Sequence, residues 1–75
     1  MERHDLIHEF PEHREKILIL QKQSNRFRKL FEDYKETDHQ IYRIEEGMVV
    51  TTDERLNELR MKRVYLKDSV YRQLV

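Results

Sequence analysis

The chain has 75 residues, of which 40% are charged and 37% are hydrophobic, and its fifteen basic and fifteen acidic residues cancel. This size allows one small domain at most, with a thin hydrophobic core, and the apolar content excludes a disordered tail. Balanced charge disfavours a nucleic-acid-binding protein, and the lack of cysteine excludes disulfide bonds and cysteine-bearing zinc sites.

The N-terminal third predicts a frayed end and one short helix. Residues 1–9 are polar and are expected to be frayed, whereas Pro11 suits the first turn of a helix from about residue 11 to residue 23. This helix carries four consecutive large aliphatic residues, Ile17, Leu18, Ile19 and Leu20. Four exceed what one packed face requires, so we expect the helix to cover the flank of the following hairpin near Phe31 and Tyr71, or to contact a second subunit.

The junction at Ser24 and Asn25 has two readings. Both residues favour helix caps over helix interiors, and Asn25 would cap a helix that begins at Arg26. The heptad spacing, in contrast, continues from Ile17 through Ser24 to Phe27 and would fit one unbroken helix. We favour a kink or a short turn at this point.

Two longer amphipathic helices are predicted at about residues 26–46 and 52–73, because apolar residues recur at steps of three, four and seven. Gly47 is expected to close the first, since glycine adopts the left-handed conformation without a Cβ penalty. Thr51 and Glu54 have capping-box spacing at the start of the second. The apolar faces are Phe27, Leu30, Tyr34, Thr37, Ile41 and Ile44, and Leu56, Leu59, Arg63, Leu66 and Val70. The pattern predicts an all-α fold, a coiled-coil-like antiparallel helical hairpin preceded by the shorter helix.

The register of the hairpin follows from mirror symmetry about residue 50. This symmetry places Ile41 against Leu59, and the polar Thr37 against Arg63, with Asp38 adjacent. A matched polar layer is typical of a pair that sets the register of two helices. We therefore expect Arg63 to reach Asp38 across the hairpin while its aliphatic stem packs between the helices.

Residues that could carry out chemistry are sparse. His4 and His8 have the i, i+4 spacing of a helical metal site, but they precede Pro11, and solvent-exposed histidines are the better account. The two serines have no neighbouring base that the pattern identifies, and the single glycine cannot form a phosphate-cradling loop. We therefore expect no enzyme, no cofactor and no metal site.

The leading hypothesis for function is a non-enzymatic module for protein–protein contacts, including self-association as a homodimer or weak oligomer. Surplus aliphatic residues and tyrosines that suit helix–helix contacts favour this reading. The candidate surface comprises Ile17, Leu18, Ile19, Leu20, Phe31, Tyr65, Tyr71 and Leu74. The sequence does not name the protein partner.

The alternative is a small regulator that binds RNA or another polyanion through the basic stretch 60–72. Its contacts would be Arg60, Lys62, Arg63 and Lys67. Cations at the end of a helix also complement its dipole, so we do not expect a nucleic-acid partner. No apolar run reaches the roughly 18–20 residues that cross a bilayer, and no signal peptide is evident, so we expect no membrane contact and a cytoplasmic location.

Several short segments stand in a characteristic order along the chain. They are His8-Glu9-Phe10-Pro11-Glu12, Ser24-Asn25 with Phe27, Arg43-Ile44-Glu45 with Gly47, Thr51-Thr52-Asp53-Glu54, and Leu66-Lys67-Asp68 with Tyr71. In this order and spacing the chain resembles the YdcH-like family of small bacterial proteins, catalogued as a domain of unknown function. The resemblance runs from His8 to Leu74. It implies an all-helical coiled-coil hairpin and a cytoplasmic location, and it brings no activity, cofactor or catalytic residue.

Overall fold

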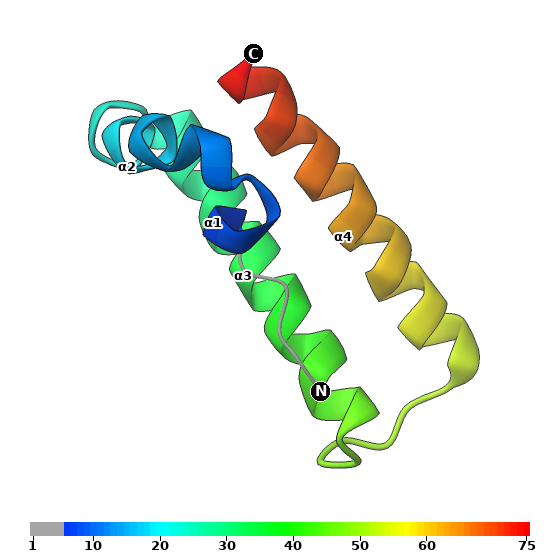
Figure 1. Cartoon of the computed structure of the whole chain (residues 1–75). Coiled ribbons are helices and arrows are strands. Elements are labelled where there is room, and N and C mark those ends of the chain that lie inside the picture. Colours follow the sequence, from blue (N-terminus) through cyan, green and yellow to red (C-terminus); the bar gives the residue numbers. More distant parts are fainter. Residues whose placement is uncertain (1–5) are drawn as a thin grey trace.

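The computed structural model describes residues 6–75, and in this part of the chain every regular element is a helix. In chain order these elements are α1 (Leu6–Glu9), the 3-10 helix η1 (Pro11–His13), α2 (Arg14–Gln23), α3 (Asn25–Glu45) and α4 (Asp53–Leu74). Helices α3 and α4 lie antiparallel, and the N-terminal elements lie against the hairpin near the start of α3 (Figure 1). The predicted all-α hairpin with a shorter preceding helix is confirmed.

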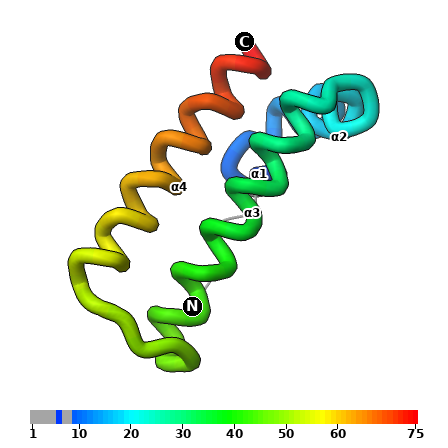
Figure 2. The backbone as a smooth tube through the Cα atoms, turned by 180° about the vertical axis from the view of Figure 1, so that it is seen from behind, coloured from blue at the N-terminus to red at the C-terminus, as the bar shows by residue number. Residues whose placement is uncertain are grey.

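The N-terminal elements lie on one side of the hairpin. Seen from behind, α3 and α4 are in front and α1 is behind α3 (Figure 2). The molecule is elongated, with extents of 37 × 20 × 17 Å. One broad side of the hairpin therefore stays open among the residues that the structure describes.

Helix α2 ends and α3 begins at Ser24, whose backbone is extended with φ −121° and ψ 115°. The Ser24 Oγ accepts a hydrogen bond of 3.1 Å from the backbone N–H of Phe27. The Nε of Arg28 donates to the carbonyl oxygen of Gln21 at 2.9 Å, which satisfies a carbonyl in the last turn of α2. The expected break is confirmed, and the N-cap is Ser24 rather than Asn25.

Gly47 ends α3 in the left-handed conformation, with φ +79°. Its N–H donates to the carbonyl oxygen of Ile44 at 3.1 Å, and the N–H of Met48 donates to that of Arg43 at 2.9 Å. These two bonds make a Schellman motif, which satisfies carbonyls that the helix leaves unpaired. The predicted glycine stop is confirmed.

Helix α4 starts one residue later than the capping-box spacing indicates. The side chain of Thr52 accepts a hydrogen bond of 3.1 Å from the backbone N–H of Arg55. Thr52 is thus the N-cap, and the expected pairing of Thr51 with Glu54 is corrected. The two threonines are chemically equivalent caps, and the path of the connector decides between them.

The core follows the predicted faces of the two long helices. Its buried apolar residues on α3 and α4 are Phe27, Tyr34, Ile41, Leu59, Leu66, Val70 and Leu74. Ile17 of α2 is also fully buried, and it clusters with five of these residues, Phe27, Tyr34, Leu66, Val70 and Leu74. Burial of such a side chain stabilises the fold by about 1.5–3 kcal/mol relative to an exposed one. The core therefore joins α2 to the hairpin.

The segment around α1 docks on the hairpin instead of fraying. Leu6 and Phe10 are buried, and the Phe10 ring stacks on Tyr71 with centroids 5.5 Å apart. The Nζ of Lys67 donates to the carboxylate of Glu9 at 2.8 Å. The expectation that residues 1–9 are frayed thus does not hold for Leu6–Glu9, because long-range contacts order them; residues 1–5 lie outside the described part of the chain.

Candidate interaction surface

The predicted interaction residues divide into a buried and an exposed group. Ile17 and Leu74 are buried, and Leu20 and Phe31 pack against the core. Ile17 and Leu74 therefore belong to the core and not to an exposed surface, whereas Leu20 and Phe31 are partly buried beside it. We expected the N-terminal helix either to cover the flank of the hairpin or to contact a second subunit. The packing of Ile17 and Leu20 with the core agrees with the first of these alternatives.

The other four candidates face solvent. Leu18 and Ile19 on α2 are 42% and 51% exposed, and Tyr65 and Tyr71 on α4 are 65% and 45% exposed. Consecutive helical residues diverge by about 100°, so Ile17 can face the core while Leu18 and Ile19 point away. The exposed apolar side chains therefore belong to two helices, α2 and α4.

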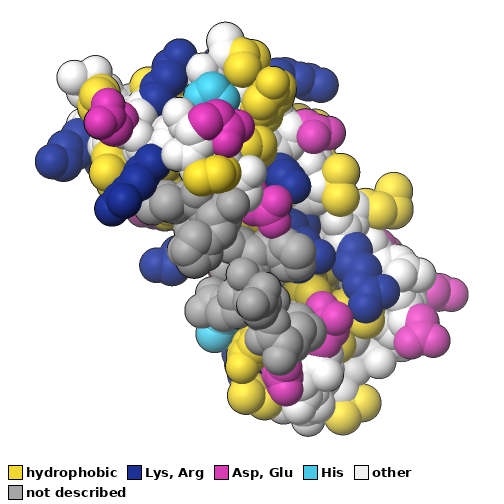
Figure 3. Space-filling model, in the orientation of Figure 1, with side chains coloured by type: hydrophobic (Ala, Val, Ile, Leu, Met, Phe, Trp, Pro, Cys, Tyr) yellow, Lys and Arg dark blue, Asp and Glu magenta, His cyan; other side chains and the backbone are white. Residues whose placement is uncertain are grey.

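The outer side of α4 carries apolar residues that sequence reasoning missed. Met61, Val64 and Val75 are exposed and lie at helical spacing with Tyr65. Figure 3 shows hydrophobic side chains along the outer edge of α4, interspersed with charged ones. The signal was present in the sequence, because these residues form a second stripe about 180° from the buried face. Helix α4 is thus apolar on two sides, and the hairpin covers one of them.

The polar layer of the hairpin has the predicted register. The Nη1 of Arg63 donates to Oδ1 of Asp38 at 3.0 Å, and the two side chains are only 20% and 5% exposed. Thr37 is buried in the same layer. Among the described residues, no buried side-chain nitrogen or oxygen lacks a hydrogen-bond partner. Arg63 is therefore part of the hairpin rather than a free basic contact.

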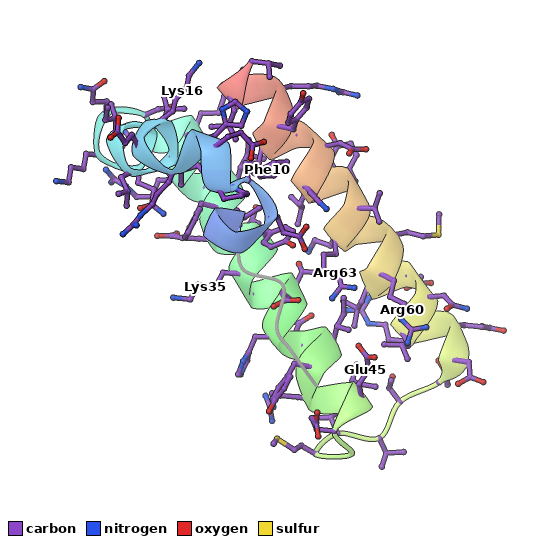
Figure 4. All side chains as sticks on the ribbon, in the orientation of Figure 1. Phe10, Lys16, Lys35, Glu45, Arg60 and Arg63 are labelled. Atoms are coloured by element: carbon purple, nitrogen blue, oxygen red, sulfur yellow. The ribbon has the colours of Figure 1, made fainter. Side chains whose placement is uncertain are left out.

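Two more of the proposed polyanion contacts are paired with carboxylates. The Nη2 of Arg60 lies 3.6 Å from Oε2 of Glu45, and the Nζ of Lys67 lies 2.8 Å from Oε2 of Glu9. Arg60 and Glu45 approach each other from α4 and α3 (Figure 4). Lys62 is exposed. The four cations thus do not form one open basic surface, because three of them hold elements of the fold together.

The described residues include no group of three histidine, cysteine, aspartate or glutamate side chains that could hold a metal ion. The side chains of the histidine pair His4 and His8 lie outside that description. In the same part of the chain, no helix has both the length and the apolar content to cross a membrane.

The sequence profile of a family described as protein of unknown function (DUF465) matches residues 27–74. The chain belongs to the DUF465 family. The match spans nearly all of α3, the connector and all of α4, so it covers the hairpin and the Asp38–Arg63 pair. Helix α2, with Leu18 and Ile19, lies outside the DUF465 match. No curated protein and no solved structure matches the chain.

Proposed function

We propose that this DUF465 protein is a non-enzymatic helical module that acts through protein–protein contacts, including contacts with a second copy of itself. The observation that carries the proposal is the division of its apolar residues. The two long helices and the N-terminal segment fill the core, yet large apolar side chains remain exposed on α2 and α4. Exposed large apolar side chains at helical spacing, as on the outer side of α4, suit contacts with another helix.

The exposed surface of the chain supports this proposal. The chain has 5641 Å² of accessible surface, whereas a monomeric protein of 9.4 kDa has about 5,000 Å² by the usual scaling of surface with mass. The excess accompanies the elongated shape, with extents of 37 × 20 × 17 Å.

The charges on α2 favour self-association of this helix. Glu15, Leu18, Ile19 and Lys22 are all exposed and lie on one helical face, at steps of three, one and three. In an antiparallel pair of α2 helices, Leu18 of one copy meets Ile19 of the other. Glu15 of each copy then meets Lys22 of its partner. Such a small contact predicts a weak dimer that forms at high micromolar concentration.

Sedimentation velocity of the full chain, from low micromolar to millimolar concentration, tests self-association. Leu18→Glu with Ile19→Lys should give a monomer that keeps its helicity. Glu15→Lys should weaken the dimer, and adding Lys22→Glu should restore it, because the ion pairs reform with exchanged charges. Wild-type protein that stays monomeric at millimolar concentration would contradict the proposal.

A matched control lies on α4. Met61→Glu with Val64→Lys introduces the same kinds of charge on another exposed apolar site. This variant should dimerise like the wild type. If it becomes monomeric while the α2 variant still dimerises, the contact between copies belongs to α4 and the assignment to α2 is wrong.

We further propose that the DUF465 hairpin is the YdcH-like, coiled-coil type of bacterial protein, acting in the cytoplasm. The support is the ordered set of segments between His8 and Leu74, which includes the helix stop at Gly47. Fractionation of bacterial cells that express the tagged chain tests the location. Recovery in the soluble cytoplasmic fraction is expected, and recovery in the periplasm or with membranes would contradict it.

A further inference from the structure

Two shallow grooves lie between α3 and α4. One has a volume of about 280 Å³ and lies between the start of α3 and the end of α4, where Leu30 and Tyr65 line it. The other has a volume of about 220 Å³ and lies near the connector, where Ile44 and Leu59 line it. These volumes show that side chains of the hairpin fill neither groove.

The two grooves lie on the same side of the hairpin. On α3, Lys29 lines the first groove and Arg43 lines the second; on α4, Ser69 lines the first and Arg55 the second. Each pair is separated by fourteen residues, which is about four helical turns, so the members of a pair share one helical face. The grooves are therefore aligned, about 21 Å apart along the helix axes.

This side is the open side of the hairpin. The N-terminal segment contacts α4 through Lys67 and Tyr71, whereas the first groove uses Tyr65, Ser69 and Gln73. At 100° per residue, these two sets flank the buried face of α4 on opposite sides. The view from behind shows this side without α1 in front of it (Figure 2).

The charged residues that line the two grooves are all basic: Arg26, Lys29 and Arg72 in the first, and Arg43 and Arg55 in the second. Carboxylates approach two of them, with Asp33 3.6 Å from Lys29 and Glu58 3.4 Å from Arg55. Both are solvent-exposed pairs within one helix, which contribute little and exchange partners readily. The groove linings thus combine apolar side chains with cations, and the carboxylates of Asp33 and Glu58 lie between the two grooves.

We propose that this side of the hairpin binds an amphipathic α-helix of a partner protein, with acidic residues beside its apolar stripe. This inference rests on the proposed interaction function and adds the chemistry of the partner. A helix with apolar residues four turns apart would place one set in each groove, and its carboxylates would meet the cations that line the grooves. A second copy docked by the same side would instead oppose cation to cation, so the occupant is a different protein.

The apolar linings favour a helix over RNA. Phosphate contacts draw on cations and need no aliphatic side chains, whereas Leu30 in the first groove and Val49 in the second present apolar surface beside the cations. An amphipathic helix uses both features at once. Tyr65 alone would suit either ligand, since aromatic rings also stack on bases.

The test uses a fluorescein-labelled helical peptide with leucine on one face and glutamate beside it, and a matched peptide with lysine in place of every glutamate. Fluorescence anisotropy with the full chain should show binding of the acidic peptide and at least about tenfold weaker binding of the basic one. Arg26→Glu with Arg72→Glu should weaken binding of the acidic peptide by at least about tenfold. Added salt should weaken it as well.

A matched control changes the same charge elsewhere. Arg14 and Lys35 are exposed and line neither groove, and Lys35 points away from α4 (Figure 4). Arg14→Glu with Lys35→Glu should bind the acidic peptide within about twofold of the wild type, because contact charges outweigh net charge at physiological salt. If this control loses as much affinity as the groove variant, net charge explains the binding and the proposed site is wrong.

Three further outcomes decide the proposal. Equal binding of the acidic and basic peptides would overturn it. A labelled single-stranded RNA is compared with the acidic peptide in the same assay. If the RNA binds more tightly, and its affinity is unchanged in Tyr65→Ser, the surface binds polyanions through charge and the proposal is overturned. The Leu18→Glu, Ile19→Lys variant should bind the peptide like the wild type, which separates this site from self-association through α2; loss of binding there would contradict the groove.

Discussion

Replacing Asp38 by alanine should destabilise the hairpin far more than the loss of an exposed ion pair. The change leaves the Arg63 guanidinium, which is 20% exposed, without its carboxylate acceptor. A hydrogen bond between charged groups contributes about 1.5–3 kcal/mol, and a charge left partly buried adds a desolvation cost. Together these effects predict a loss of about 2–4 kcal/mol in the free energy of unfolding, which approaches the total of about 3–5 kcal/mol for a domain this small.

A double-mutant cycle isolates the pair. Its members are Asp38→Ala, Arg63→Met, which keeps the aliphatic stem, and the combined variant, each unfolded with urea and followed by far-UV circular dichroism. A stabilising osmolyte keeps the weakest variants folded at the start of the titration. We expect a coupling energy of about 1.5–3 kcal/mol between the two positions.

The exposed Arg55–Glu58 pair, with its nitrogen and oxygen 3.4 Å apart, provides the matched control. Its cycle should give a coupling energy of about 0.5 kcal/mol or less. If the Asp38–Arg63 pair gives a value as small as this control, the pair does not set the register and the reasoning from burial is refuted.

Three further changes test the local structure by thermal and urea unfolding. Leu59→Ala should cost about 2–4 kcal/mol because this residue is buried in the core, and melts that match the wild type would contradict the predicted buried face of α4. Gly47→Ala should cost about 1 kcal/mol through backbone strain alone, since φ is +79° and no atom lies within 4 Å of an added Cβ; an unchanged stability would show that this turn relaxes. Ser24→Ala should cost about 1 kcal/mol and Asn25→Ala much less, and the reverse order would return the N-cap of α3 to Asn25.

The helices could be predicted from sequence because their signals are local. Periodic apolar residues define α3 and α4, and Gly47 marks the end of α3 through a backbone conformation that glycine favours. The observed N-caps, Ser24 and Thr52, each lie one position from the residue that the sequence predicted, Asn25 and Thr51. Neighbouring residues of similar capping ability differ in the structure by backbone dihedral angles, which a sequence pattern does not contain.

The docking of the N-terminal segment could not be predicted by the same means. Glu9 and Lys67 are separated by 58 positions in the chain, and Phe10 meets Tyr71 over a similar separation. Such contacts depend on where the break at Ser24 directs α2. The large apolar side chain of Phe10 immediately before Pro11 was the available signal in the sequence, and only the tertiary structure gives it a partner, Tyr71.

Only part of the candidate surface could be predicted, because exposure also depends on tertiary contacts. The run of four aliphatic residues indicated surplus apolar surface, but the orientation of α2 decides that Ile17 is buried and that Leu18 and Ile19 are exposed. The basic residues of the stretch 60–72 are evident from the sequence. The carboxylates that pair with Arg60 and Arg63, in contrast, lie on the other long helix, α3. Sequence analysis predicted the register, but it named an ion-pair partner for Arg63 alone, and the pairing of Arg60 with Glu45 was missed.

Amide NMR spectra of the labelled full chain, recorded from low micromolar to millimolar concentration, test the proposed contact between copies most directly. Self-association through α2 predicts concentration-dependent shifts for the amides between Glu15 and Lys22, and unchanged amides in the connector at residues 46–52. The Leu18→Glu, Ile19→Lys variant should show no such shifts. Wild-type spectra that stay constant up to millimolar concentration, or shifts that fall on α4 and spare α2, would contradict the account.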